Sequence, residues 1–170
     1  MATLYIMSGI PGSGKTTYAK KHLPHAVYIG SDAIRKELYG KEMTIRGNWM
    51  IHRLMIERAY SNLKAGRDVA VDSVHGSRDA RRRYYRILPP GAKITAIYMD
   101  IPVSVALSNN RKRKRHVPAA GILLLNALIT RPTLEEGFDQ VILVRDYSGL
   151  TKIICEWKDK KSELIEVREL

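Results

Sequence analysis

The segment GIPGSGKT, residues 9–16, has the residue types and the spacing of a phosphate-binding loop. Its glycines allow backbone N–H groups to turn toward phosphate oxygens, and a helix that begins at Lys15 would direct its positive end at the same anion. We expect Lys15 to reach the β- and γ-phosphates of ATP and Thr16 to place its hydroxyl on Mg²⁺. The alternative is a glycine-rich turn without a ligand. The predicted ATP-binding residues here are Gly9, Gly12, Ser13, Gly14, Lys15, Thr16 and Thr17.

A carboxylate and an arginine follow the second predicted strand, in the segment SDAIR. Ligands of an open α/β sheet bind beyond the carboxyl ends of the strands, so Asp32 should face the same crevice as the loop. Asp32 could accept the proton of an attacking hydroxyl, and Arg35, close to one helical turn later, could hold an acceptor phosphate. The alternative is that Asp32, or Ser31 in its place, caps the following helix.

The third predicted strand ends in VDSVH. P-loop proteins commonly keep an acidic residue near Mg²⁺ at this place, so Asp72 is the expected partner of Thr16 in a metal site. His75 is interpreted as an ordinary polar loop residue in preference to an acid or base.

The segment NNRKRKRHVP, residues 109–118, is a candidate lid. A mobile arginine-rich lid would close over the triphosphate, because guanidinium groups hydrogen-bond phosphoryl oxygens in pairs. In an extended segment Arg111, Arg113 and Arg115 would share one face, and the intervening Lys112 and Lys114 would point away from it. In a helical segment, a different combination of these cations would share one face.

A second basic segment, RDARRRYYR, begins at Arg78. In a helix predicted over residues 77–87, Arg78, Arg82 and Arg86 share one stripe, with tyrosines interleaved. Such a surface could follow a nucleic-acid backbone and stack bases, which makes Arg78 and Arg82 candidate acceptor-binding residues. A solvated face whose tyrosines pack inward is the alternative.

Short apolar runs alternate with amphipathic stretches along the chain, and this pattern predicts the elements that must position these residues. Strands separated by helices indicate a five-stranded, mainly parallel sheet with helices on both faces, the α/β fold of P-loop NTPases. The apolar residues of GILLLNALI, residues 121–129, are expected in the core. Predicted strands cover 3–9, 26–31, 68–74, 93–100 and 138–146, and predicted helices cover 15–23, 32–40, 43–66, 77–87, a stretch from 102 onward and 118–129.

Composition narrows the class of protein. With 170 residues the chain suits one domain, and 29 Lys and Arg against 17 Asp and Glu give a formal charge of +12, which makes a polyanionic partner plausible. Cys155 is the single cysteine, so an internal disulfide and a zinc site of several thiolates are excluded. The first residues do not resemble a basic leader followed by an apolar core, and no apolar run approaches the roughly 18 residues of a membrane span. We therefore expect a cytoplasmic protein.

Taken together, GIPGSGKTT, SDxIR, VDS, NxxRxRxVP and EEGFDQV resemble the P-loop kinases of the phage-type polynucleotide 5′-kinase group and their small stand-alone relatives. The resemblance covers about residues 3–146. It implies that Asp32 is the general base for a 5′-hydroxyl and that Arg35 contacts the acceptor's phosphate. It also implies that Asn110 and Arg113 belong to the lid signature, with Arg113 as the arginine that meets the transition state. Position 109 departs from the pattern, because it is Asn where relatives usually carry Arg.

The sequence thus predicts an ATP- and Mg²⁺-dependent phosphotransferase that acts on the 5′-OH of DNA or RNA. Two alternatives stay open: a P-loop kinase of a nucleoside, sugar or metabolite, and a nucleic-acid-binding ATPase or regulatory NTP-binding module. Residues 1–146 are expected to form the P-loop kinase domain. Residues 147–170 are expected to pack on the same domain, as a hairpin, although the last residues, ELIEVREL, could equally form a helix.

Overall fold

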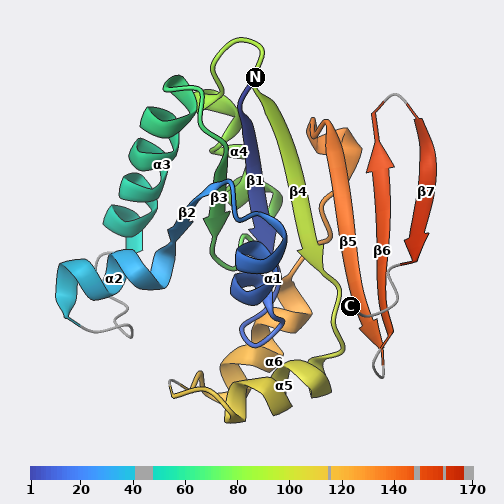
Figure 1. Ribbon diagram of the computed structural model, residues 1–170. Coiled ribbons are helices and arrows are strands. Elements are labelled where there is room, and N and C mark those ends of the chain that lie inside the picture. The colour runs from blue at the N-terminus through green and yellow to red at the C-terminus, as the bar shows by residue number, and fades with distance from the viewer. Residues whose placement is uncertain (41–47, 115, 148–149, 159, 167–170) are drawn as a thin grey trace.

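The computed structural model describes residues 1–40, 48–114, 116–147, 150–158 and 160–166. Figure 1 shows a central sheet with helices on both sides. In chain order the elements are β1 (Thr3–Ser8), α1 (Lys15–His22), β2 (Val27–Gly30), α2 (Ser31–Tyr39), α3 (Asn48–Lys64), β3 (Val69–Asp72), α4 (Arg78–Arg82), the 3₁₀ turn η1 (Tyr85–Ile87), β4 (Lys93–Met99), α5 (Val103–Arg111), α6 (Ala119–Leu128), the 3₁₀ turn η2 (Leu134–Glu136), β5 (Gln140–Tyr147), β6 (Leu150–Trp157) and β7 (Lys160–Glu166).

The seven strands form one sheet in the order β2-β3-β1-β4-β5-β6-β7. The strands from β2 to β5 are parallel, and β6 and β7 continue the sheet as an antiparallel hairpin beside β5. The predicted α/β fold with its five-stranded parallel sheet is therefore confirmed. The C-terminal residues that the structure describes form the hairpin and not a helix.

Alternating side chains of the central strands separate two cores, as expected for a parallel sheet covered on both faces. Leu4 and Ile6 of β1 pack with buried residues of α3, whereas Met7 packs with Ala19 of α1 on the opposite face. A third cluster lies between α5 and α6 and includes Ile122. Because β1, β2 and β3 are parallel, their carboxyl ends meet at one edge of the sheet, where the loops that follow them converge.

The basic segment of residues 77–87 differs from the single helix that its composition predicts. α4 ends at Arg82, and after it the chain changes to i→i+3 hydrogen bonds from Ile87 to Tyr84 and from Leu88 to Tyr85. The tighter 3₁₀ turn changes the angular spacing of the side chains, and Tyr84 is buried in the core beneath it. Arg78, Arg82 and Arg86 therefore do not share one continuous helical stripe.

Two further differences concern the helices. In α6 Ile122 is buried and Leu125 packs against its cluster, whereas Leu123, Leu124 and Leu128 are 50%, 61% and 65% exposed, so the prediction that this apolar run lies in the core is wrong for these three leucines. The helix predicted over residues 43–66 begins at Asn48, and its first predicted residues, 43–47, lie outside the described residues. Among the helices that the structure describes, none is long and apolar enough to cross a membrane.

Candidate active site

The predicted phosphate loop joins β1 to α1. Gly9, Gly12 and Gly14 have positive φ values of 150°, 84° and 91°. A Cβ on Gly12 would lie 2.2 Å from the backbone oxygen of Ala106 in α5, so only glycine allows the loop to pass this close to α5. α1 begins directly after the loop, at Lys15, and the N–H groups of its first turn have no intrahelical partner. The loop and helix together have the geometry of an anion-binding site.

One polar atom of the loop fits a phosphate ligand. Ser13 is buried, and its Oγ has no hydrogen-bond partner among the described residues. This oxygen lies over Gly9, where a Cβ would be only 2.8 Å away. An unpaired buried hydroxyl costs about 1–3 kcal/mol, and a phosphate oxygen held in the loop would accept its hydrogen bond. The loop therefore fits the triphosphate of ATP.

The side chain of Lys15 folds back over this loop. Its Nζ donates hydrogen bonds to the backbone oxygens of Gly9 at 2.8 Å and Ile10 at 2.9 Å. Burial lowers the pKa of Lys15 to about 8; the nearby Asp72 carboxylate opposes this shift, and the Arg113 guanidinium adds to it. The ammonium group is thus held at the loop, where it could form an ion pair with a bound phosphate.

Two oxygen ligands for a metal ion meet beside the loop. Thr16, in the first turn of α1, donates a hydrogen bond from Oγ1 to Oδ2 of Asp72 at 2.6 Å. Asp72 comes to this place because β3 is the parallel neighbour of β1, with Asp72 in register with Met7. A hydroxyl and a carboxylate are ligands that Mg²⁺ accepts together with phosphate oxygens and waters. These two residues would therefore hold Mg²⁺ beside the triphosphate, and a bound ion would neutralise charge that develops on the phosphoryl oxygens.

Asp32 and Arg35 form a pair on the first turn of α2. Nη1 of Arg35 lies 2.7 Å from Oδ1 of Asp32, and Nη2 of Arg35 donates to Oδ1 of Asn48 at 3.2 Å. The N-cap position of α2 is Gly30, so neither Ser31 nor Asp32 is the capping residue. Asp32 lies inside the first turn and is 43% exposed, which leaves its carboxylate accessible from the cleft. The capping alternative is therefore wrong for this helix.

The lid segment begins as a continuation of α5. The backbone N–H groups of Lys112 and Arg113 donate to the backbone oxygens of Asn109 and Asn110 at 3.1 and 3.2 Å. The buried Asn110 then holds the far end of the segment: its Nδ2 donates to the oxygen of Val117 at 2.8 Å, and its Oδ1 accepts from the Val117 N–H at 3.0 Å. One asparagine thus joins the two ends of the basic segment.

This turn changes which cations face the loop. Lys112 and Arg113 line the cleft, whereas the exposed Arg111 is not among its lining residues. Of the two conformations left open, the extended one with Lys112 pointing away does not occur at Lys112 and Arg113, because the backbone keeps turning past the end of α5. Arg115, the third predicted lid arginine, lies outside the described residues.

Sequence reasoning missed two polar residues of the site. Asn109 Nδ2 donates to the backbone oxygen of Gly12 at 3.1 Å and so connects α5 to the phosphate loop. The only signal for it was its departure from the family pattern at position 109. The hydroxyl of Tyr28 donates to Asp72 at 2.5 Å, and nothing in the sequence of β2 indicated this contact.

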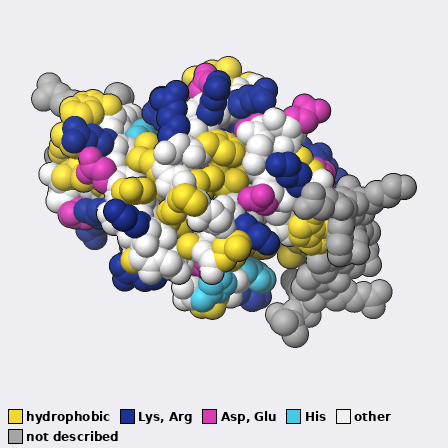
Figure 2. All heavy atoms as spheres, turned by 90° about the horizontal axis from the view of Figure 1, so that it is seen from above, with side chains coloured by type: hydrophobic (Ala, Val, Ile, Leu, Met, Phe, Trp, Pro, Cys, Tyr) yellow, Lys and Arg dark blue, Asp and Glu magenta, His cyan; other side chains and the backbone are white. Residues whose placement is uncertain are grey.

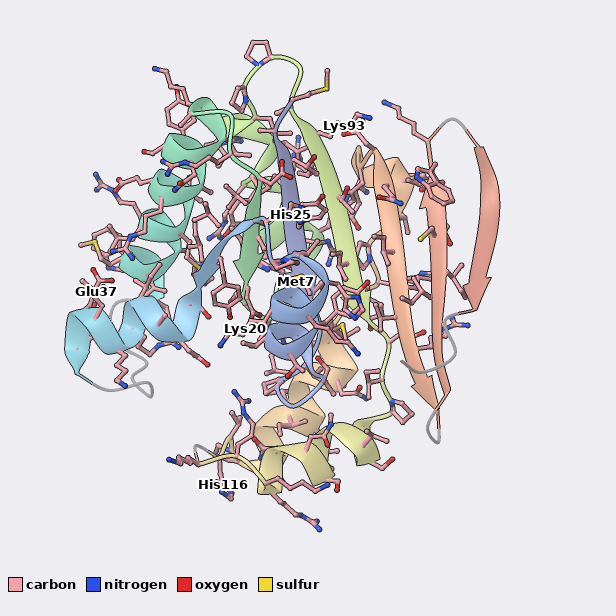
Figure 3. The ribbon with its side chains drawn as sticks, in the orientation of Figure 1. Met7, Lys20, His25, Glu37, Lys93 and His116 are labelled. Carbon is pink, nitrogen blue, oxygen red and sulfur yellow. The ribbon has the colours of Figure 1, made fainter. Side chains whose placement is uncertain are left out.

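These elements enclose one cleft with a volume of about 1070 Å³. Figure 3 shows Lys20 on α1 and His116 in the segment that joins α5 to α6. The volume is enough for a nucleotide together with part of an acceptor. The predicted site residues that line the cleft are Gly12, Ser13, Gly14, Lys15, Thr16, Thr17, Asp32, Arg35, Asp72 and Arg113.

Arg78 and Arg82 lie outside this cleft. They line a separate pocket of about 380 Å³ with Tyr85 and Glu136. Arg81, between them in sequence, is fully buried and binds the Glu136 carboxylate through Nε at 2.9 Å and Nη2 at 2.6 Å. Figure 2 shows Lys and Arg side chains at several places on this face, with one group along its upper edge. The structure therefore does not bring Arg78 and Arg82 together with Asp32.

His75 is a buried residue of the fold and not an ordinary polar loop residue. It is 3% exposed, with Nδ1 2.7 Å from the backbone oxygen of Met7 and Nε2 3.2 Å from the hydroxyl of Tyr84. Because a carbonyl can only accept, Nδ1 carries the proton and Nε2 accepts from Tyr84. Burial lowers the pKa of His75 to about 4, so the ring is neutral at pH 7. His75 therefore supports the core behind the loop.

The fold and the loop define the class of this protein as a P-loop α/β domain. Residues 4–132 match the model of the AAA domain family AAA_33. This match covers more than half of the chain, and the chain belongs to that family.

Solved structures share the fold at low sequence identity. A gluconokinase from Sinorhizobium meliloti 1021 is 20% identical with a TM-score of 0.59, and the match covers 85% of this chain and 82% of that one. A sugar kinase from Janibacter sp. HTCC2649 is 22% identical with a TM-score of 0.62 and 85% of each chain covered. A chain of the Pnkp1/Rnl/Hen1 RNA repair complex is 20% identical with a TM-score of 0.67, over 75% of this chain and 43% of that one. The similar folds thus include proteins named for sugars and for RNA repair.

Proposed function

We propose that this protein transfers the γ-phosphoryl group of ATP to a hydroxyl group, with Asp32 as the general base. The observation that carries the proposal is the Asp32–Arg35 pair, which lines the same cleft as Lys15 and Thr16 of the phosphate loop. A phosphate loop alone would serve hydrolysis or simple nucleotide binding. A carboxylate in the same cleft can accept a proton, which transfer to an acceptor hydroxyl requires.

In the proposed reaction the acceptor oxygen attacks the γ-phosphorus, its proton passes to the Asp32 carboxylate, and the bond to the β-phosphate oxygen breaks to release ADP. Lys15 holds the transferring phosphate, and Arg113 on the lid approaches its oxygens from the other side of the loop. Both residues supply positive charge where negative charge spreads in the transition state. The lowering of the Lys15 pKa by Arg113 is consistent with the two cations lying near the same point.

We propose the 5′-OH of DNA or RNA as the acceptor. The cleft is lined by cations from three elements: Lys20 and Lys21 of α1, Arg35 and Lys36 of α2, and the two lid cations Lys112 and Arg113. Such a lining favours a polyanion, whose phosphates displace small counterions on binding. On acceptor binding, Arg35 would replace its hydrogen bond to the neutral amide of Asn48 with a hydrogen bond to a charged phosphate. The hydrogen bond to the charged group is the stronger one.

A small-molecule kinase is the second candidate, and one observation favours it. Arg78 and Arg82 line a pocket of their own, so the basic surface near α4 does not continue the lining of the cleft. An acceptor held entirely within the cleft would need no such continuation. The gluconokinase and the sugar kinase of the same fold show that this architecture occurs in proteins with those names.

The test is incubation with γ-labelled ATP and Mg²⁺ against a panel of 5′-OH oligonucleotides of DNA and RNA, nucleosides and sugars. We expect label at the 5′ end of an oligonucleotide, and no transfer by Lys15→Ala, which removes the loop cation. Label on a sugar or nucleoside alone would replace the polynucleotide proposal with the second candidate. Release of labelled phosphate to water, equal with and without every acceptor, would contradict the kinase proposal and indicate an ATPase.

A further inference from the structure

Three oxygens meet at the place where a metal ion is expected. The Tyr28 hydroxyl donates to Oδ2 of Asp72 at 2.5 Å, and Thr16 Oγ1 donates to the same oxygen at 2.6 Å. The Tyr28 and Thr16 oxygens are 3.5 Å apart. A hydrogen bond from a hydroxyl to a carboxylate at such a distance is among the strong ones in proteins.

The local structure of β2 places this hydroxyl. Tyr28 and Gly30 lie on the same side of the strand, two residues apart, and Gly30 is in register with Asp72 of β3. The Tyr28 ring extends along the strand over Gly30: a Cβ at position 30 would be 2.9 Å from both Cε1 and the hydroxyl oxygen. Only glycine leaves the space that lets the ring reach from its own strand to the end of the next one.

We propose that Tyr28 is a positioning residue of the metal site, which fixes the Asp72 carboxylate in the orientation that receives Mg²⁺. Two donors, one from β2 and one from α1, converge on Oδ2, so two hydrogen bonds fix the position of this oxygen. Oδ1 of Asp72 accepts no hydrogen bond from the described residues and is left for the ion or one of its waters. Partners of this kind typically change metal affinity about 10–100-fold when they are removed.

This inference rests on the proposed ATP and Mg²⁺ chemistry and is tested without an acceptor. Binding of a non-hydrolysable ATP analogue is measured by calorimetry at increasing Mg²⁺ and again in EDTA. Tyr28→Phe removes one oxygen and keeps the ring. We expect it to raise the Mg²⁺ concentration for half-maximal enhancement of binding by about 10-fold, and to leave binding in EDTA within about twofold.

Two further variants separate positioning from packing. Tyr60→Phe removes the hydroxyl of an exposed tyrosine on α3 and should leave both binding curves unchanged. Gly30 has an extended backbone, φ −101° and ψ 134°, so Gly30→Ala introduces no backbone strain and acts by displacing the Tyr28 ring. Gly30→Ala should weaken the Mg²⁺ response about as much as Tyr28→Phe, and the double variant should lose little more than either single one.

The outcomes distinguish this inference from the proposed function. An unchanged Mg²⁺ response in Tyr28→Phe, in a protein whose binding does depend on Mg²⁺, overturns the inference and leaves the kinase proposal in place. An equal loss in EDTA and in Mg²⁺ also overturns it, because Tyr28 would then support the loop and not the metal site. If the unmodified protein binds the analogue with no Mg²⁺ dependence, the proposed function fails together with the inference.

Discussion

Replacement of Asp32 by Asn separates the proposed base from a residue that only supports α2. The change keeps the size and shape of the side chain and removes its charge and basicity. The structural cost should be small, because an Asn oxygen at this position can still accept from Arg35, which is 14% exposed, and the carboxylate that is lost is 43% exposed; an exposed ion pair contributes about 0.2–1 kcal/mol. The catalytic cost should be larger, since a positioned base contributes about 10²- to 10⁴-fold. This range corresponds to about 3–5 kcal/mol of transition-state stabilisation.

The assay is single-turnover phosphoryl transfer with ATP and the labelled acceptor both saturating, so that differences in binding drop out. ATP·Mg²⁺ affinity and the free energy of unfolding are measured on the same preparations. Glu57→Gln is the matched control: it breaks an exposed ion pair of the same length, Arg53 to Glu57 at 2.7 Å, on α3 and away from the lining of the cleft. We expect Glu57→Gln to transfer at the normal rate, and Asp32→Asn to lose at least 10²-fold with nearly normal ATP binding.

The reasoning is refuted if Asp32→Asn transfers within a few-fold of the unmodified protein under these conditions. A loss of transfer that matches a loss of ATP affinity would also refute it, because Asp32 would then act on the nucleotide. A fall of several kcal/mol in stability would show that the Asp32–Arg35 pair holds α2 in place, against the small value expected from its exposure.

Other predictions address the lid, the buried histidine and the outer arginines. Arg113→Ala should lower kcat by about 10³- to 10⁵-fold with a smaller effect on ATP affinity, whereas Arg111→Ala should change kcat little; the reverse order in steady-state kinetics would shift the lid assignment. The folded-state pKa of His75, about 4, lies below its ordinary value of 6.5, so the unfolded chain binds more protons between these values and stability falls as pH falls through this window. Urea unfolding should give about 2 kcal/mol less at pH 4.5 than at pH 7 from this group, and His75→Gln should flatten the slope; equal slopes would contradict the assignment. The KM for a 5′-OH oligonucleotide should rise steeply with salt. If Arg78 and Arg82 contact the acceptor, replacing each by Ala should reduce the slope of log KM against log salt concentration by about one. Unchanged slopes would show that neither residue belongs to the acceptor site.

Much of the candidate site could be predicted because its signals are local. The phosphate loop needs glycine conformations, a strand before it and a helix after it, and all of these lie within the first 22 residues. Asp32 and Asp72 could be placed because each follows or ends a recognisable strand, and parallel strands bring their carboxyl ends to one edge. The alternation of β1 side chains between two cores follows from the same periodicity. In each case a short stretch of sequence carries the physical reason.

The lid and the second basic segment show where local reasoning failed. Charge identified both segments, but it did not decide their backbone conformation. Lys112 faces the cleft because the chain continues to turn after α5, and Asn110 holds that turn by contacts with Val117. Arg81 is buried by Glu136, a residue 55 positions later in the chain, so a basic helix could not reveal which of its arginines points inward.

The sequence by itself determined that the chain forms a parallel α/β sheet with a phosphate loop after its first strand, because strand and helix periodicity, glycine conformations and helix starts depend on neighbouring residues. Only the tertiary structure decided that Tyr28 of β2 reaches Asp72 on the neighbouring β3, that Asn109 holds the loop from α5, and that three leucines of α6 remain exposed. These features depend on the distance between elements far apart in the chain. That distance is set by how the whole core packs. Gly30 is an example: because it has no Cβ, the Tyr28 ring on the same strand has room to reach the Asp72 carboxylate on β3.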